Sequence, residues 1–252
     1  MQETEGIQHA TAHRPWPKPR MPWVMFQSWQ RLLFAHWPLP ASVLRPLVPP
    51  QLTLEEFEGS AWLGLTPFIL RDLRPRGIPV FPVISDFPEM NLRTYVRHGT
   101  RAGIWFFTLE AASTLAVIAA RTLFRLPYHH ARMEVQDRDG WIEYSSYRRE
   151  GNAAFEGRYR PMGTSFEPRY GTLEHFLTER YALFTVLRNG WVLRGDIHHV
   201  PWRLQRAEAE IGLNTVPAAH GITLPDVAPL LHYSERQDTL IWAPELDDAR
   251  PS

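Results

Sequence analysis

The chain is predicted to be a β-rich α+β protein that folds as a closed or nearly closed, mainly antiparallel barrel with two short helices. Short apolar and aromatic runs bounded by proline and glycine recur along it, and many short strands at such spacing are typical of barrels and sandwiches. Asp139-Gly140 and Asn189-Gly190 supply the positive φ that tight hairpins need. The strands that flank these two turns are therefore expected to pair antiparallel.

One domain is expected to account for most of the chain. Its 252 residues are 44% hydrophobic, enough apolar surface to offset the entropy of ordering one large core. Residues 1–22 carry four prolines near their end and no apolar periodicity, so we expect a disordered arm there. The predicted domain then spans 23–244, and 245–252 form a tail.

The charge balance and the lack of cysteine exclude several function classes. Lys+Arg 27 equals Asp+Glu 27, which predicts neither a nucleic-acid nor a membrane partner. With Cys 0 the chain has no thiolate nucleophile and no thiolate metal site, and no cofactor or metal is expected. The apolar stretch 115–120 is too short to cross a bilayer, and no signal peptide precedes it. We therefore expect a cytoplasmic protein, with a homo-oligomer left open.

Two segments are predicted to be helical. Residues 112–124 are rich in Ala, Leu and Ile, and Ser113 is placed to cap their N-terminus. Residues 172–180 form the second, and Thr172 is placed to cap its N-terminus.

One predicted strand, residues 89–96, carries an unusual set of polar side chains. Alternation places Glu89, Asn91, Arg93 and Tyr95 on one face and apolar residues on the other. An ordinary solvent-facing strand explains this pattern as well as a binding site does. In the functional interpretation the stripe faces a pocket, and Arg93 binds a substrate carboxylate that Glu89 helps to orient.

Two histidines end apolar strand faces. His129 begins the face that continues to Met133, and His199 ends the face that starts at Trp191. Both could transfer protons near neutral pH, although histidines hydrogen-bonded to backbone are at least as common. Glu110 follows an aromatic strand and is either catalytic or a favourable charge beside the next helix.

Several motifs together resemble one family. The chain resembles the YqjF-like family of uncharacterised bacterial proteins from about residue 29 to 244. The motifs that carry the resemblance are Leu33-Phe34-Ala35-His36-Trp37-Pro38, Phe87-Pro88-Glu89-Met90-Asn91-Leu92-Arg93-Thr94-Tyr95-Val96, Leu126-Pro127-Tyr128-His129-His130-Ala131-Arg132, Phe176-Leu177-Thr178-Glu179-Arg180-Tyr181 and His198-His199-Val200-Pro201-Trp202.

That family is similar, more distantly, to acetoacetate decarboxylase, which implies a closed barrel-like domain around a central pocket. The decarboxylase carries its Schiff-base lysine in a Phe-Pro-Lys-Lys run, and the resemblance places Tyr128 and His129 at the lysine positions. Neither side chain can form an iminium. The only lysine here, Lys18, lies in the predicted arm, so Schiff-base chemistry is not expected.

The leading hypothesis is a barrel that binds a small apolar or carboxylate-bearing metabolite. One alternative is a lysine-independent lyase or hydrolase that uses His and Glu as acid and base, and another is a non-catalytic regulatory or interaction module. The candidate ligand-binding residues are Arg93, Asn91, Tyr95, Tyr128 and His199. The catalytic candidates are His129, Glu89 and Glu110.

Overall fold

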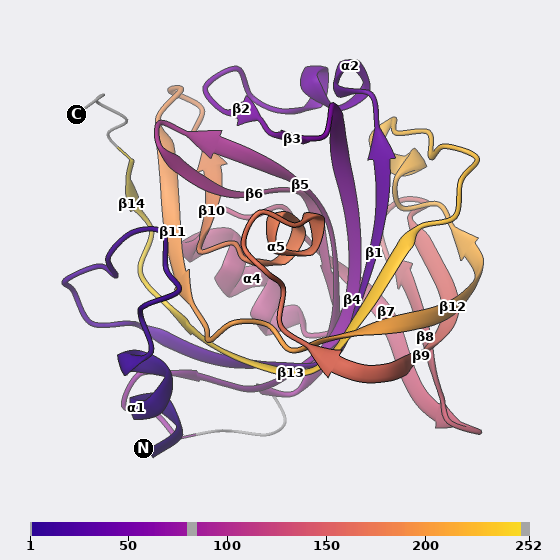
Figure 1. The fold of residues 1–252 in the computed structure, drawn as a ribbon, viewed down its shortest axis with the longest axis horizontal. Helices are drawn as coiled ribbons and strands as arrows, with labels where there is room; N and C mark the ends of the chain where they lie inside the picture. Colours follow the sequence, from indigo (N-terminus) through magenta and orange to yellow (C-terminus); the bar gives the residue numbers. More distant parts are fainter. Residues whose placement is uncertain (1, 80–84, 248–252) are drawn as a thin grey trace.

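A computed structural model describes residues 2–79 and 85–247 as a strand-rich fold with few helices (Figure 1). The strands are β1 (Met25–Leu39), β2 (Thr53–Leu54), β3 (Glu56–Phe57), β4 (Ser60–Pro75), β5 (Phe87–His98), β6 (Arg101–Ala111), β7 (Tyr128–Arg138), β8 (Trp141–Arg148), β9 (Ala154–Phe166), β10 (Ala182–Val186), β11 (Val192–His198), β12 (Leu204–Asn214), β13 (Leu230–Ile241) and β14 (Glu245–Leu246). The helices are α1 (Gln2–His9), α2 (Ala41–Leu44), α4 (Thr114–Leu123) and α5 (Leu173–Thr178), with 3-10 turns at Arg45–Leu47 and Ala218–His220.

The strand pairings close on themselves in two rings that share one wall. β6 pairs with β5 along its length, with β10 near its middle and with β7 at its end. β13 pairs with β1, with β12 near its start and with β11 at its end. One ring, here the core ring, runs through β6, β7, β8, β9, β12, β13, β1, β4 and β5. The other, the cavity ring, runs through β6, β10, β11, β13, β1, β4 and β5.

The expected strand-rich, mainly antiparallel fold is confirmed, but the sheet is mixed. β6 runs parallel to both β7 and β10, and the other described pairs are antiparallel. Both predicted hairpins form. Asp139 and Gly140 have positive φ between β7 and β8, and Gly190 has positive φ between β10 and β11.

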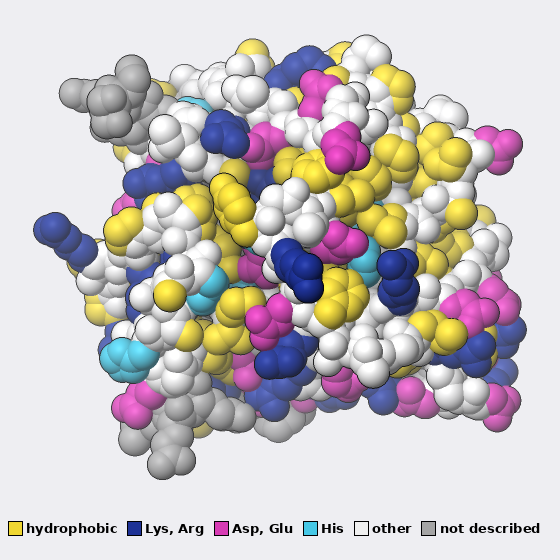
Figure 2. Space-filling model, in the orientation of Figure 1, with side chains coloured by type: hydrophobic (Ala, Val, Ile, Leu, Met, Phe, Trp, Pro, Cys, Tyr) yellow, Lys and Arg dark blue, Asp and Glu magenta, His cyan; other side chains and the backbone are white. Residues whose placement is uncertain are grey.

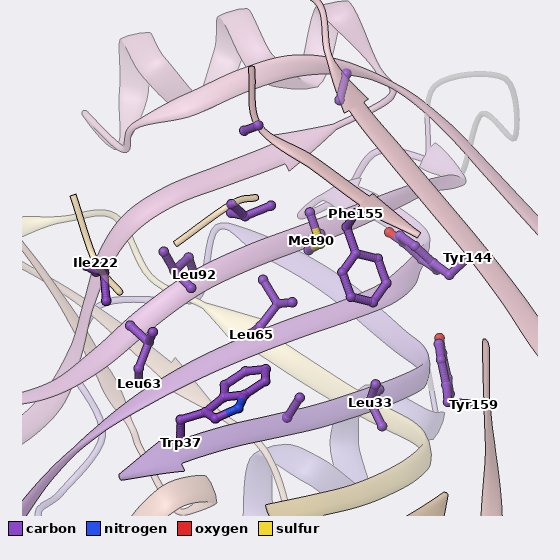
Figure 3. Packing of buried hydrophobic residues seen from close by; sticks show 14 of the residues in the cluster. Leu33, Trp37, Leu63, Leu65, Met90, Leu92, Tyr144, Phe155, Tyr159 and Ile222 are labelled. Carbon is purple, nitrogen blue, oxygen red and sulfur yellow. The ribbon is translucent and has the colours of Figure 1, made fainter. Parts of the chain in front are cut away.

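The core ring is filled by apolar side chains (Figure 3). Leu33, Leu65 and Leu92 from three neighbouring strands of the shared wall pack with Tyr144 and Phe155 from the opposite side. Burial of such side chains is the main favourable contribution to folding. The core ring therefore holds the hydrophobic core and leaves the cavity ring available for a site.

The two predicted helices are present and begin at the predicted caps. Ser113 accepts a hydrogen bond from the backbone N–H of Ala116 at the start of α4, and Thr172 accepts one from His175 at the start of α5. The fold also has α1 and α2, which sequence reasoning did not predict. In Figure 1, α5 lies toward the viewer and α4 behind it.

The expectation of a disordered arm before residue 23 is wrong for the described residues. Ile7 of α1 is buried against Trp242. The Arg14 guanidinium donates to the backbone oxygen of Ile197 at 2.7 Å, and Trp16 Nε1 donates to Asp196 at 3.1 Å. Composition missed this docking because its partners lie almost two hundred residues away along the chain.

The expected tail is also partly engaged. β14 pairs with β11, and Asp247 accepts a hydrogen bond from Arg101 at 2.9 Å. Residues 248–252 lie outside the described residues. No described helix is long and apolar enough to span a bilayer.

We predict that the arm contributes to stability. Replacing Arg14 with Ala should lower the free energy of unfolding by about 1–3 kcal/mol, because the backbone oxygen of Ile197 loses a hydrogen bond from a cation and buried Asp196 loses an ion-pair partner 3.6 Å away. Denaturant unfolding monitored by fluorescence measures this change. Arg20→Ala, at an exposed arm position, serves as the control. Equal stability of the two variants would show that the arm contacts contribute nothing.

Candidate functional site

The polar stripe of β5 faces the cavity ring, and the apolar face of the same strand faces the core ring. Glu89, Asn91 and Arg93 are buried and line a cavity, whereas Met90 and Leu92 belong to the hydrophobic core. The predicted alternation is therefore confirmed. The solvent-face alternative is wrong, because both faces of this strand are covered.

The cavity has a volume of about 240 Å³ and a mainly apolar wall. Its sides come from the cavity ring, with α4 at one end and the segment after α5 at the other. A concave apolar pocket with a few converging polar groups is the usual form of a small-molecule site. The apolar wall includes Trp29, Leu32, Phe68, Leu70, Phe87, Ile104, Phe106, Leu109, Leu126, Leu183 and Trp202.

Arg93 places a buried positive charge in this wall. It forms no ion pair with any carboxylate of residues 2–79 or 85–247, in contrast to the nearby Arg180, which binds Glu55. The Arg93 guanidinium carbon lies 5.2 Å from the ring centre of Phe34. A cation without an ionic partner in an apolar setting is costly, so a ligand anion would find a strong partner here.

Polar atoms next to Arg93 are also unpaired. Thr66 lies opposite Asn91 in the β4–β5 register, and both side chains line the cavity. Buried polar atoms without hydrogen bonds are uncommon, and each requires an explanation. The unpaired cavity-lining atoms are Arg93 Nε, Asn91 Oδ1, Thr66 Oγ1 and Trp202 Nε1.

Glu89 and Tyr128 form a second polar station. The Tyr128 hydroxyl donates to Glu89 Oε1 at 3.0 Å, and both side chains line the cavity. Burial raises the pKa of Glu89 from 4.5 to about 8, although the hydrogen bond from Tyr128 opposes the shift. At neutral pH the carboxyl is therefore mainly protonated and can donate a proton or a hydrogen bond.

Tyr95 lies beyond Arg93, away from α4, and does not line the cavity. Its hydroxyl is 2.6 Å from His36 Nε2, and burial together with the Arg93 charge lowers the pKa of His36 well below its usual value. Gly64 makes room for this arrangement, because a Cβ there would lie 3.0 Å from the His36 ring and 3.4 Å from Arg93. Tyr95 thus supports Arg93 from behind, which corrects its assignment as a direct ligand contact.

His199 lines the cavity, but both of its ring nitrogens face backbone oxygens. Nδ1 is 2.8 Å from the oxygen of Val200, and Nε2 is 3.3 Å from that of Arg180. Burial lowers its pKa. The ring of Tyr181 stacks on it at 4.7 Å. His199 therefore shapes the cavity wall, and its ring nitrogens are already engaged by backbone oxygens.

His129 and Glu110 lie on the other side of the shared wall. They pair with each other in the β6–β7 register, and neither lines the cavity. Glu110 accepts a hydrogen bond from Arg148 at 2.9 Å, and burial with nearby Arg148 lowers the pKa of His129 to about 4. Of the three catalytic candidates, only Glu89 lines the cavity, because strand alternation separates it from His129 and Glu110.

Sequence reasoning missed Thr66, Arg180 and Trp202 as cavity residues. Thr66 joins the site only through the β4–β5 register, which a single sequence does not reveal. Arg180 and Trp202 occur in the motifs that carry the family resemblance, and this was the one sequence feature that pointed to them as site residues. Across the described residues, no group of three His, Asp or Glu side chains is arranged to hold a metal ion.

Solved structures with a similar fold are acetoacetate decarboxylase-like. An acetoacetate decarboxylase from Legionella pneumophila superposes with a TM-score of 0.63 and 12% identity, covering 94% of this chain and 93% of that one. The enduracididine biosynthesis enzyme MppR gives 0.62 and 10%, with the same coverage. An acetoacetate decarboxylase-like enzyme from Sphingomonas wittichii gives 0.60 and 12%, covering 94% and 98%. The class of fold is thus that of acetoacetate decarboxylase.

The sequence itself identifies a narrower group. Residues 26–238 match the family DUF2071, described as an uncharacterized conserved protein. The chain is also 50% identical over 221 residues to the uncharacterized protein YqjF of Bacillus subtilis, covering 87% of this chain and 91% of that protein. The chain belongs to the DUF2071 family, and its resemblance to YqjF-like proteins is confirmed.

Glu89 should make stability depend on pH in a specific direction. Because its pKa is raised from 4.5 to about 8, the native state binds more protons than the unfolded state between these values, so the free energy of unfolding falls as pH rises through this window. Glu89→Gln should remove this loss. From pH 5 to pH 8, the free energy of unfolding of the variant should rise by about 2–4 kcal/mol relative to that of wild type.

Denaturant unfolding at several pH values measures this difference. The exposed Glu134 provides the control variant Glu134→Gln, which should follow the wild-type pH profile. If Glu89→Gln keeps that profile too, the carboxyl of Glu89 is ionised in the native protein at neutral pH and the assignment of its protonation state is wrong.

Proposed function

We propose that the chain binds a small carboxylate-bearing molecule with an apolar body in the cavity. Arg93 carries the proposal, because its guanidinium is buried, lines the cavity and forms no ion pair with the described part of the chain. In this proposal the strands of the cavity ring form a small barrel, and the cavity is its lumen.

The carboxylate is assigned to the end of the cavity near Arg93. A guanidinium binds a carboxylate through paired charge-assisted hydrogen bonds, and the unpaired Thr66 hydroxyl, which can donate, also lines the cavity. MppR, whose fold is similar, is solved in complex with pyruvate. That complex supports the view that a fold of this class can hold a small carboxylate.

The apolar body is assigned to the space between Arg93 and α4. Glu89 and Arg93 are four residues apart on one strand, so their Cα atoms lie about 13 Å apart. The wall along this path is mainly aromatic and aliphatic, and its polar groups are the Glu89–Tyr128 pair, Asn91 and Thr66. The fitting ligand is therefore an amphiphile with its charge at the inner end.

Calorimetric titration with matched ligand pairs tests the proposal. Octanoate and 3-phenylpropionate should bind more tightly than octanol and 3-phenylpropanol, which lack the charge. Arg93→Gln should weaken carboxylate binding by about tenfold to a hundredfold, since a hydrogen bond to a charged group contributes about 1.5–3 kcal/mol. Binding of the alcohols should not change.

Two control variants locate the effect. His129→Ala, on β7 outside the cavity lining, and Arg132→Gln, on the exposed surface, should keep wild-type affinity for octanoate. Equal affinity for acids and alcohols, or wild-type affinity in Arg93→Gln, would contradict the proposal.

Lysine-independent acid–base catalysis, as in a lyase or hydrolase, is a second candidate function. One observation favours it: Glu89, with a pKa of about 8, lines the cavity beside Tyr128. A carboxyl with such a pKa is suited to proton transfer near neutral pH. In that case Glu89→Gln would retain ligand affinity while it abolished turnover.

We also predict that carbonyl chemistry here involves no covalent amine. Lys18 is the only lysine of the chain, and it donates to the backbone oxygen of Gln8 outside the cavity wall. Treatment with borohydride and pyruvate or acetoacetate should leave the mass of the peptide from Trp23 onward unchanged. A trapped adduct in that peptide, detected by mass spectrometry, would contradict the prediction.

A further inference from the structure

Helix α4 leaves large apolar side chains exposed to the outside. Ala116 and Ala120 line the cavity, whereas Leu115 and Ile118 are 63% and 56% exposed. A helix that only covers a core does the reverse, because it buries its largest apolar residues and exposes polar ones. The outer face of α4 is therefore shaped to contact something apolar.

The mouth of the cavity lies at the same helix. Among the residues that line the cavity, only Leu123 and Pro75 are exposed, Leu123 by 66%. Leu123 ends α4, and Pro75 ends β4. The exposed apolar face of α4 is thus continuous with the entrance to an apolar cavity. A contiguous exposed apolar surface of this kind marks an interaction site.

The segments around the mouth are positively charged, although the chain as a whole is neutral. Residues 112–127 contain two arginines and no acidic residue, and residues 73–79 contain two more arginines and again no acid. Arg125 and Arg76 are exposed. Net charge alone predicts no membrane partner, but the local charge around the mouth complements an anionic surface.

We propose that the outer face of α4 docks on an anionic lipid surface and opens the cavity mouth toward the bilayer. Leu115, Ile118 and Leu123 insert among the acyl chains, and the flanking arginines contact lipid phosphates, as an interfacial helix does. The route of ligand entry rests on the proposed function, because an apolar carboxylate dissolves in a bilayer. The docking itself rests on α4 and its surrounding charge alone.

Vesicle flotation tests the docking. The full-length protein should float with vesicles of phosphatidylcholine mixed with phosphatidylglycerol, and much less with phosphatidylcholine alone. Leu115→Ser combined with Ile118→Ser should reduce the bound fraction at least about tenfold. Arg76→Gln combined with Arg125→Gln should reduce it on anionic vesicles only. Arg121 is left unchanged because its guanidinium donates to the backbone oxygen of Tyr128 at 2.6 Å.

Control variants change exposed apolar residues and exposed arginines elsewhere. Val227→Ser combined with Tyr170→Ser alters two exposed apolar side chains outside the cavity lining, and Arg132→Gln combined with Arg138→Gln alters two exposed charges of β7. Both control proteins should float like wild type. The proposal is overturned if wild type does not float, or if the α4 variants float as well as the controls do.

A second copy of the chain is the competing occupant of this face. Sedimentation velocity would reveal it as a dimer that the Leu115 and Ile118 substitutions dissociate, and that outcome would overturn lipid docking. Octanoate affinity in solution separates this proposal from the proposed function. It should be unchanged in the α4 variants, and its absence in wild type would contradict the proposed function while the flotation result stood.

Discussion

The structure depends on a wall of strands that is buried on both faces. β13, β1, β4, β5 and β6 belong to both rings, so each strand must serve a packed core with one set of alternate residues and a cavity with the other. On β5 this requirement separates Met90 and Leu92 from Glu89, Asn91 and Arg93. Moving one residue in register would place the charges in the core, and the register is therefore strongly determined.

The same wall determines which polar groups can act together. Glu89 and Tyr128 lie on the cavity side and are hydrogen-bonded across strands, whereas Glu110 and His129 lie on the core side with Arg148. A β-bulge between the Leu92 and Arg93 pairings of β5 with β6 lets Phe106 and Leu109 both face the cavity. The cavity wall is thus apolar along β6 and polar along β5, which suits an amphiphilic ligand.

Sequence reasoning predicted the parts of this arrangement that depend on local pattern. Two-residue alternation identified the polar face of β5, glycine turns identified two hairpins, and Ser113 identified the start of α4. It did not predict pairings between distant segments. The Thr66–Asn91 pairing and the docking of Arg14 onto β11 needed the register and the fold. The apolar face of the strand that begins near His129 was correctly predicted, but the fold places that face in the core ring.

The central claim is that a ligand carboxylate occupies the cavity at Arg93 with its apolar body toward α4. A crystal structure with bound 8-bromooctanoate tests it directly, because anomalous scattering locates the bromine. We predict carboxylate oxygens within hydrogen-bond distance of the Arg93 guanidinium and bromine close to Ala116 and Ala120. Bromine beside Arg93, or a carboxylate bound outside this cavity, would contradict the account.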